Sequence, residues 1–175
     1  MLIKNLSGFL GQEVEIKGWV YNLRSSGNIF FLQIRDGSGF TQAVVSKGSV
    51  SESVLADCAK LSLESSVIIK GKVTQHPRKS DVFELQATDL QIAQVAVEYP
   101  IGKKEHGPDF LMEYRHLWLR SPKQWAILRV RDAIMLAIEE FLHGADFVRV
   151  DSPIFTPNAC EGTTTLFPVP YFDLG

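Results

Sequence analysis

The sequence predicts an all-β barrel of five strands and one helix, followed by a shorter segment of mixed helix and strand, and three observations indicate this. Residues 13–96 mostly alternate between apolar and polar positions, as the strands of a half-buried sheet do. Residues 99–121 differ in character, with Pro and Gly spaced among charged residues. A long helical pattern then leads into a short apolar run and a proline. We therefore divide the chain into residues 1–98, 99–121 and 122–175.

Three strands are expected in the first half of the barrel. One face of the first strand holds Val14, Ile16, Gly18 and Val20. The second strand, residues 29–35, alternates in the same way, with one face formed by Phe30, Leu32 and Ile34 and the other by Phe31, Gln33 and Arg35. A turn at residues 36–39 leads into a third strand at 40–45.

The period of the pattern then changes from strand to helix and back. A helix is expected next, because apolar residues recur at helical spacing behind Ser49 or Ser51, either of which is a candidate N-cap. These apolar residues are Val50, Val54, Leu55, Cys58 and Leu61. Two further strands, residues 66–74 and 82–96, flank a turn at 76–81. Three strands, a helix and two strands is the order of an OB-fold barrel, in which the helix closes one end. A β-grasp or SH3-like barrel is the alternative, and the helix after the third strand argues against the SH3-like form.

Composition excludes several function classes. The 175-residue chain has a formal net charge of −2, and residues 1–98 carry ten basic and ten acidic side chains, so it lacks the basic surplus of a non-specific DNA or RNA coat protein. It has no apolar run long enough for a membrane helix and no secretory leader. Cys58 and Cys160 match no metal-binding spacing. These features favour a reduced, cytoplasmic chain without a metal site, a membrane segment or a DNA partner.

The start of the second half carries a strong helix signal. Ser121 is a candidate N-cap, Pro122 fits the first helical position, and Gln124 completes a capping box. The helix is expected to run to about His143, with apolar residues around more than half of its circumference. A short strand is expected at residues 147–150.

Four motifs in order resemble one enzyme family. The helix, strand and proline of residues 141–155 resemble motif 1 of the class II aminoacyl-tRNA synthetases. Residues 98–121 are similar to the hinge of the asparaginyl enzymes, and residues 160–167 are similar to their flipping loop, which closes over the amino acid. Gly18-Trp19-Val20 and residues 31–39 resemble the anticodon-binding barrel of the aspartyl, asparaginyl and lysyl subgroup.

The resemblance implies an OB-fold anticodon-binding domain at 1–98, a hinge at 99–121 and a truncated N-terminal segment of an α+β class II catalytic domain at 122–175. The implied activity is ATP-dependent ligation of asparagine to its tRNA, with Mg²⁺ bridging the phosphates. Motifs 2 and 3, which supply the ATP-binding arginines in this family, have no counterpart in these 175 residues. We therefore expect no catalytic residue and no bound cofactor here, and no adenylate formation by this chain alone.

The resemblance also assigns candidate tRNA-binding residues in the barrel. Phe31 matches the aromatic that stacks on an anticodon base, Gln42 matches a base-edge reader, and Arg24 matches a phosphate or base contact. The alternation supports an exposed Phe31, because it lies opposite the apolar face of its strand. An exposed aromatic on an OB sheet is a stacking platform for an unpaired base. The alternative is that Phe31 packs under the linker or the helix.

Two more sets of residues come from the resemblance. Glu161 and Gly162 match the flipping loop, where the acid would receive the α-ammonium group and the glycine would let the loop move. A solvated loop acid is the alternative for Glu161. The dimer interface of motif 1 corresponds to Phe147, Val150 and Pro153. The family usually has Gly before the motif 1 aromatic, and Asp146 stands there, a residue that tolerates a left-handed backbone.

The expected partners are the anticodon stem-loop of a tRNA and a second copy of the chain. Three other interpretations stay open. The parent enzyme can be an aspartyl-tRNA synthetase of the same subgroup, the chain can be a truncated, non-catalytic RNA-binding protein that uses only its barrel, or it can be a piece of a longer reading frame.

Overall fold

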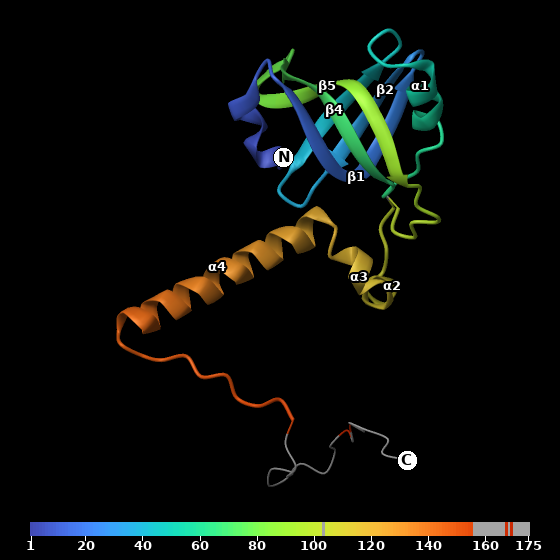
Figure 1. Ribbon diagram of the computed structural model, residues 1–175. Helices are drawn as coiled ribbons and strands as arrows, with labels where there is room; N and C mark the ends of the chain where they lie inside the picture. The colour runs from blue at the N-terminus through green and yellow to red at the C-terminus, as the bar shows by residue number, and fades with distance from the viewer. Residues whose placement is uncertain (103, 156–166, 168, 170–175) are drawn as a thin grey trace, which may run out of the picture. The chain divides into compact units, whose positions relative to one another are not determined.

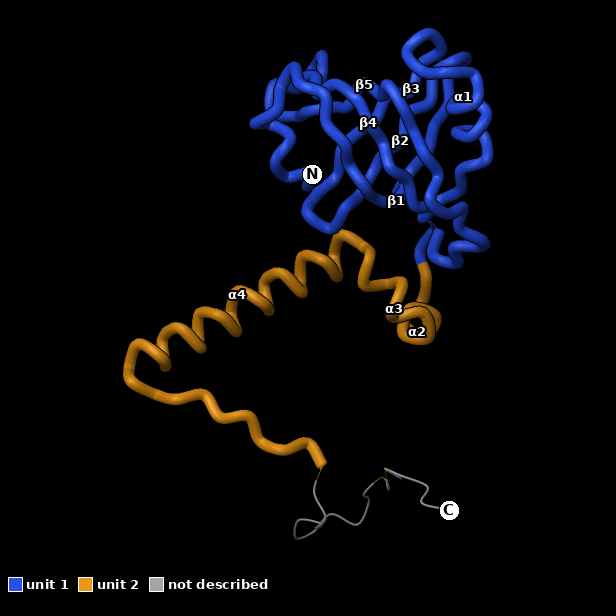
Figure 2. The backbone as a smooth tube through the Cα atoms, viewed as in Figure 1, with its two compact units in different colours: residues 1–105 blue, residues 106–175 orange. Residues whose placement is uncertain are grey.

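The computed structural model describes residues 1–102, 104–155, 167 and 169. The chain separates into two compact units, Met1–Glu105 and His106–Gly175 (Figure 2). The break between them falls inside the segment 99–121 that the sequence marks as a hinge.

The first unit is a five-stranded barrel with a 3₁₀ helix before β1 and a short α-helix between β3 and β4 (Figure 1). Its strands pair in the order β1-β2-β3-β5-β4, and β4 pairs back onto β1, so that the sheet closes. The elements are η1 (Ile3–Phe9), β1 (Glu13–Ser26), β2 (Ile29–Arg35), β3 (Phe40–Ser46), α1 (Glu52–Cys58), β4 (Ser66–His76) and β5 (Lys79–Gln94). The predicted OB fold of five strands plus a helix is confirmed.

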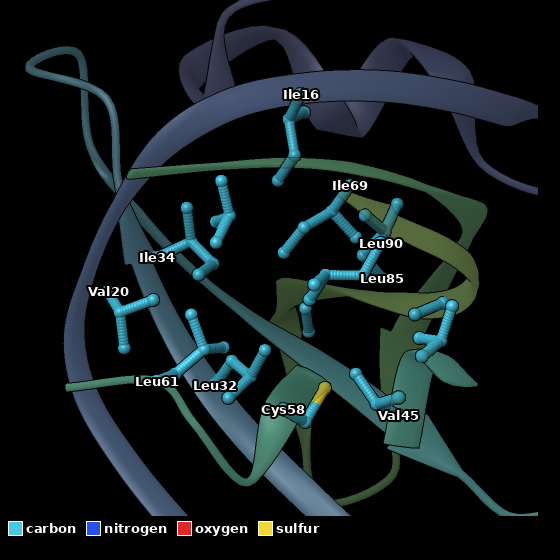
Figure 3. Close-up of a cluster of buried hydrophobic side chains, with 14 of the residues drawn as sticks. Ile16, Val20, Leu32, Ile34, Val45, Cys58, Leu61, Ile69, Leu85 and Leu90 are labelled. Atoms are coloured by element: carbon cyan, nitrogen blue, oxygen red, sulfur yellow. The ribbon is translucent and has the colours of Figure 1, made fainter. Parts of the chain in front are cut away.

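The barrel interior is filled by the apolar face that the alternation predicts. Leu32 and Ile34 of β2 have no exposed surface, and neither do Ile16 and Val20 of β1 (Figure 3). Phe30 is half-buried against the same cluster. Helix α1 begins behind Ser51, whose hydroxyl accepts a hydrogen bond from Val54 N at 3.4 Å. The buried residues of this core are Ile3, Leu6, Ile16, Val20, Leu32, Ile34, Ala43, Val45, Val54, Cys58, Leu61, Val67, Ile69, Val73, Leu85, Ala87 and Leu90.

The structure adds three features that the sequence pattern did not indicate. The 3₁₀ helix η1 buries Ile3 and Leu6 against the barrel. Strands β4 and β5 extend into the predicted turn at 76–81, because His76 pairs with Lys79 and leaves only two residues between the strands. Strand β1 runs past Val20 to Ser26, with a bulge at Tyr21 where its register against β2 shifts by one residue.

A buried ion pair links β2 to the loop before β4. Arg35 Nη2 lies 2.7 Å from Glu64 Oε2, and both side chains are almost fully buried. Glu64 has a φ of 67°, a left-handed conformation that is uncommon outside glycine. Its amide donates to Val20 O at 2.7 Å, so the loop is held at two points despite the backbone strain.

The second unit consists of helices α2 (Pro108–Glu113), α3 (Arg115–Trp118) and α4 (Pro122–Gly144), followed by extended chain. As predicted, α4 begins behind Ser121, whose hydroxyl accepts from Gln124 N at 3.4 Å, with Pro122 in its first turn. It ends in a Schellman motif: Phe147 N donates to Leu142 O, and Asp146 N donates to His143 O. Asp146 has a φ of 65°, which confirms that this position takes the left-handed backbone.

The predicted strand at residues 147–150 is wrong in this structure, where these residues belong to no helix or strand. A strand needs a partner for its backbone N–H and C=O groups, and the described residues of the second unit include no other strand. Helix α4 likewise has no buried residue. Its apolar side chains lie exposed on several faces, including Ile127, Val130, Ile134, Ile138 and Phe141.

Candidate nucleic-acid interface

The bulge in β1 decides which way Arg24 points. Before the bulge, the even-numbered residues Ile16 and Val20 face the core, and an unbroken alternation would turn residue 24 inward as well. Tyr21 is the extra residue, so Leu23 pairs with the inward Leu32 instead. Arg24 therefore lies on the outer face, directly across from Phe31.

Phe31 and Arg24 lie beside each other on the outer face of the barrel. The Arg24 guanidinium carbon lies 5.8 Å from the centroid of the Phe31 ring, within the range of a cation–π contact. Arg24 is exposed and Phe31 is half-buried. Both line an open depression whose walls come entirely from the five strands, with no contribution from α1 or from the linker after β5.

A chain of polar contacts fixes the side chain of Gln42 in the same depression. Gln42 Nε2 donates to Glu84 Oε1 at 2.7 Å, and Gln42 Oε1 accepts from Arg24 Nη2 at 3.4 Å. Glu84 pairs with Gln42 across the β3–β5 ladder, and the side chain of Glu84 is only 6% exposed. Because the carboxylate only accepts hydrogen bonds, it must take the amide NH₂ of Gln42 and turn the carbonyl oxygen toward Arg24.

His76 approaches the same carboxylate from the β4–β5 hairpin. Its Nε2 lies 3.6 Å from Glu84 Oε1, while its Nδ1 accepts a hydrogen bond from Arg78 N at 3.0 Å. In the neutral ring the proton therefore sits on Nε2, facing Glu84. Glu84 is thus approached by donors from both sides.

The depression has a volume of about 270 Å³ and combines three kinds of group. It offers the aromatic rings of Phe31 and Phe40, two cationic side chains and an amide whose orientation is fixed. These are the groups that recognise unpaired RNA, by stacking, by phosphate contact and by base-edge hydrogen bonding. The lining residues are Asn22, Arg24, Phe31, Gln33, Phe40, Thr41, Gln42, His76, Lys79, Val82 and Glu84.

The three predicted tRNA-binding residues therefore lie together, although they come from β1, β2 and β3. Sequence reasoning missed Glu84 and His76. Glu84 reaches the site through the parallel pairing of β3 with β5, a crossover that no local pattern reveals. His76 belongs to the hairpin that was expected to be a loose turn.

The other predicted residues lie elsewhere in the chain. Glu161 and Gly162 of the predicted flipping loop lie outside the described residues. Phe147, Val150 and Pro153 are exposed, and the first two line a largely apolar hollow with the end of α4, including Leu142 and His143. Arg149 crosses this hollow to pair with Glu139, with 2.6 Å between Nη1 and Oε1.

Neither a cluster of metal-binding side chains nor a membrane-spanning helix occurs in the part of the chain that the structure describes. No group of three or more His, Cys, Asp or Glu side chains lies together there as a candidate metal site. No helix among residues 1–102 and 104–155 has the length and apolarity needed to cross a membrane.

Two family models match the two units in order. Residues 14–93 match the OB-fold nucleic acid binding domain, and residues 107–174 match the class II tRNA synthetases for D, K and N.

Several of the similar proteins, including curated relatives about 50% identical to this chain, are asparaginyl enzymes. The asparagine–tRNA ligase of Pelotomaculum thermopropionicum is 50% identical over 171 residues, which cover 98% of this chain and 40% of that protein. The asparagine–tRNA ligase of Thermus thermophilus is 47% identical, with 99% and 40% covered. The crystal structure of asparaginyl-tRNA synthetase from Pyrococcus horikoshii, complexed with asparaginyl-adenylate, is 36% identical with a TM-score of 0.85 and covers 99% of this chain and 41% of that one.

The chain spans about two fifths of the length of these relatives. A match to the OB-fold domain is followed along the chain by a match to the class II synthetases. The sequence match to an asparagine–tRNA ligase spans both parts. Over nearly its whole length, therefore, the chain matches the N-terminal part of the asparaginyl-tRNA synthetases of class II.

Proposed function

We propose that this chain is part of an ATP-dependent ligase that joins asparagine to its tRNA, and that its barrel binds the tRNA anticodon through the outer face formed by β1, β2 and β3. The observation that carries the proposal is the placement of Arg24, Phe31 and Gln42 in one depression of an OB barrel. The identity to asparagine–tRNA ligases supports asparagine rather than aspartate as the amino acid.

Each of the three residues has a distinct role in this proposal. The Phe31 ring stacks on an unpaired base, a contact worth ~1–3 kcal/mol per base. Arg24, exposed above that ring, meets a phosphate or the base itself. Gln42 uses one of its two amide protons on Glu84 and one of its two carbonyl lone pairs on Arg24. It presents the second proton and the second lone pair to a base edge.

The proposal also assigns a role to each of the three segments of the chain. Residues 1–98 bind tRNA, residues 99–121 form the hinge, and residues 122–175 begin the catalytic domain. Glu161 and Gly162 close over the bound amino acid. Phe147, Val150 and Pro153 contribute to a homodimer, a role that the exposed apolar surface of α4 supports. The enzyme acts in the cytoplasm.

ATP and Mg²⁺ belong to the complete enzyme in this proposal. Adenylate formation needs positive charge placed against the triphosphate and an aligned carboxylate, and the family's motifs 2 and 3, which provide that charge, are not among these 175 residues. The 175-residue chain by itself is therefore inactive. Asparagine-dependent pyrophosphate exchange by the purified chain, lost in Glu161→Ala, would contradict this.

Filter binding tests the anticodon assignment. The purified chain is titrated with asparagine tRNA, with aspartate tRNA, and with asparagine tRNA carrying a changed anticodon. We expect the tightest binding to the intact asparagine tRNA and a weakening by ~1–3 kcal/mol in Phe31→Ala. Equal affinity for all three tRNAs would remove the anticodon assignment, and tighter binding of aspartate tRNA would favour the aspartyl enzyme.

A further inference from the structure

A second aromatic ring lines the same depression, and neither the sequence motifs nor the proposed anticodon contacts use it. Phe40, the first residue of β3, is 41% exposed and contributes to the wall that Phe31 and Gln42 also form. An exposed aromatic ring in a concave site lined by polar and cationic side chains offers a flat face on which an unpaired base can stack.

The register places Phe40 at the opposite end of the depression from Phe31. Phe31 pairs with Val44, and Phe40 lies four residues before Val44 on β3. At ~3.3 Å per residue this separates the backbone positions that carry the two rings by ~13 Å along the strand. Gln42 lies between them on the same outer face, because it is two residues from each of Phe40 and Val44.

The Phe40 ring is held in place from the side. Tyr21, the bulge residue of β1, contacts it edge-on, with 4.9 Å between ring centroids and 69° between ring planes. On the neighbouring strand, Arg35 pairs with Phe40 across the β2–β3 ladder, and its side chain is itself fixed by Glu64. A ring braced in this way loses little further freedom when a base stacks on it.

We propose that Phe40 is a second stacking platform, which takes a different unpaired base of the RNA loop from the one on Phe31. This inference rests on the proposed function, because it assumes that the depression binds RNA. Stacked bases are ~3.4 Å apart, so two rings carried by backbone positions ~13 Å apart cannot hold two neighbouring bases of one stack. The loop therefore binds splayed out, with one base at each ring and the edge of a base between them facing Gln42.

The test uses the 175-residue chain and the anticodon stem-loop of asparagine tRNA with 2-aminopurine at one loop position at a time. Fluorescence of this base is quenched when it stacks. Phe40→Leu keeps an apolar side chain but removes the π-face, Phe40→Thr gives a residue suited to a strand surface if leucine impairs folding, and Phe40→Tyr keeps the ring. Phe9→Leu is the matched control, since Phe9 is 38% exposed and does not line the depression.

We expect Phe40→Leu and Phe40→Thr to weaken binding by about fivefold or more, while Phe40→Tyr and Phe9→Leu bind as the parent chain does. We also expect Phe40→Leu to relieve quenching at one loop position and Phe31→Leu to relieve it at another. Parent-like binding by Phe40→Leu, beside a weakened Phe31→Leu, would overturn the second platform and leave the proposed function standing. Relief at the same loop position in both variants would also overturn it. If neither variant weakened binding, the proposed function would fail as well.

Discussion

Phe31 and Leu32 are neighbours in the sequence, yet the structure separates their roles completely. Leu32 lies inside the barrel with no exposed surface, whereas Phe31 lies outside, half-buried beside Arg24. Leu32→Ala removes fully buried methyl groups and leaves a cavity, which costs ~2–5 kcal/mol of stability. Phe31→Ala removes about half of the apolar contact of a buried ring, which costs ~1 kcal/mol, but it removes the whole stacking surface.

Two measurements on the same pair of variants separate these effects. In a domain of this size, 1 kcal/mol shifts the unfolding midpoint by ~4–8 °C. Leu32→Ala should therefore lower the midpoint of the barrel by ~10 °C or more, and Phe31→Ala by only a few degrees. In filter binding at a low temperature, where both variants are folded, the order reverses: Phe31→Ala loses ~1–3 kcal/mol of tRNA binding, and Leu32→Ala binds almost as the parent chain does.

Two outcomes would refute this reasoning. If Phe31→Ala unfolded as early as Leu32→Ala, Phe31 would be part of the core and not a stacking surface. If folded Leu32→Ala lost as much tRNA affinity as Phe31→Ala, the division between the two faces of β2 would not control binding.

Three other groups in the barrel give further predictions. Arg24→Gln should reduce the slope of log affinity against log salt concentration by about one, as expected for one lost phosphate contact, and an unchanged slope would exclude that contact. Glu64→Gln should destabilise the barrel by ~3 kcal/mol in denaturant unfolding, because it removes the carboxylate charge that lies 2.7 Å from the buried Arg35 cation; the double variant with Arg35→Met should recover most of the loss. Burial, together with the charge of Asp57, raises the pKa of the Cys58 thiol from 9.0 to about 11. Between pH 9 and pH 11 the Cys58 thiol loses its proton in the unfolded chain but keeps it in the folded chain. The free energy of unfolding should therefore fall as pH rises from about 9 to about 11, and it should fall less steeply in Cys58→Ser.

Much of the fold follows from local patterns in the sequence. The alternation around Leu32 assigns the core face of β2, and the serines at positions 51 and 121 mark the starts of α1 and α4. These signals work because burial repeats every two residues in a strand and because the first amides of a helix need an acceptor. Both can be identified within a few neighbouring residues.

The site depends on features that no local pattern contains. A bulge is a mismatch in residue count between two strands, so the outward turn of Arg24 appears only once β1 and β2 are paired. Glu84 meets Gln42 through the parallel pairing of β3 with β5, which brings together residues 42 positions apart. The segment 147–150 has strand-like residues but no partner strand among those described, and its strand does not form.

The central claim is that the outer face of β1, β2 and β3 contacts the anticodon loop. Titrating the ¹⁵N-labelled chain with the anticodon stem-loop of asparagine tRNA, and following the amide and side-chain resonances, tests it directly. The account predicts that the largest shifts occur at Arg24, Phe31 and the Gln42 side-chain amide, with α1 unaffected. Shifts centred on α1, or spread evenly over the barrel, would contradict it.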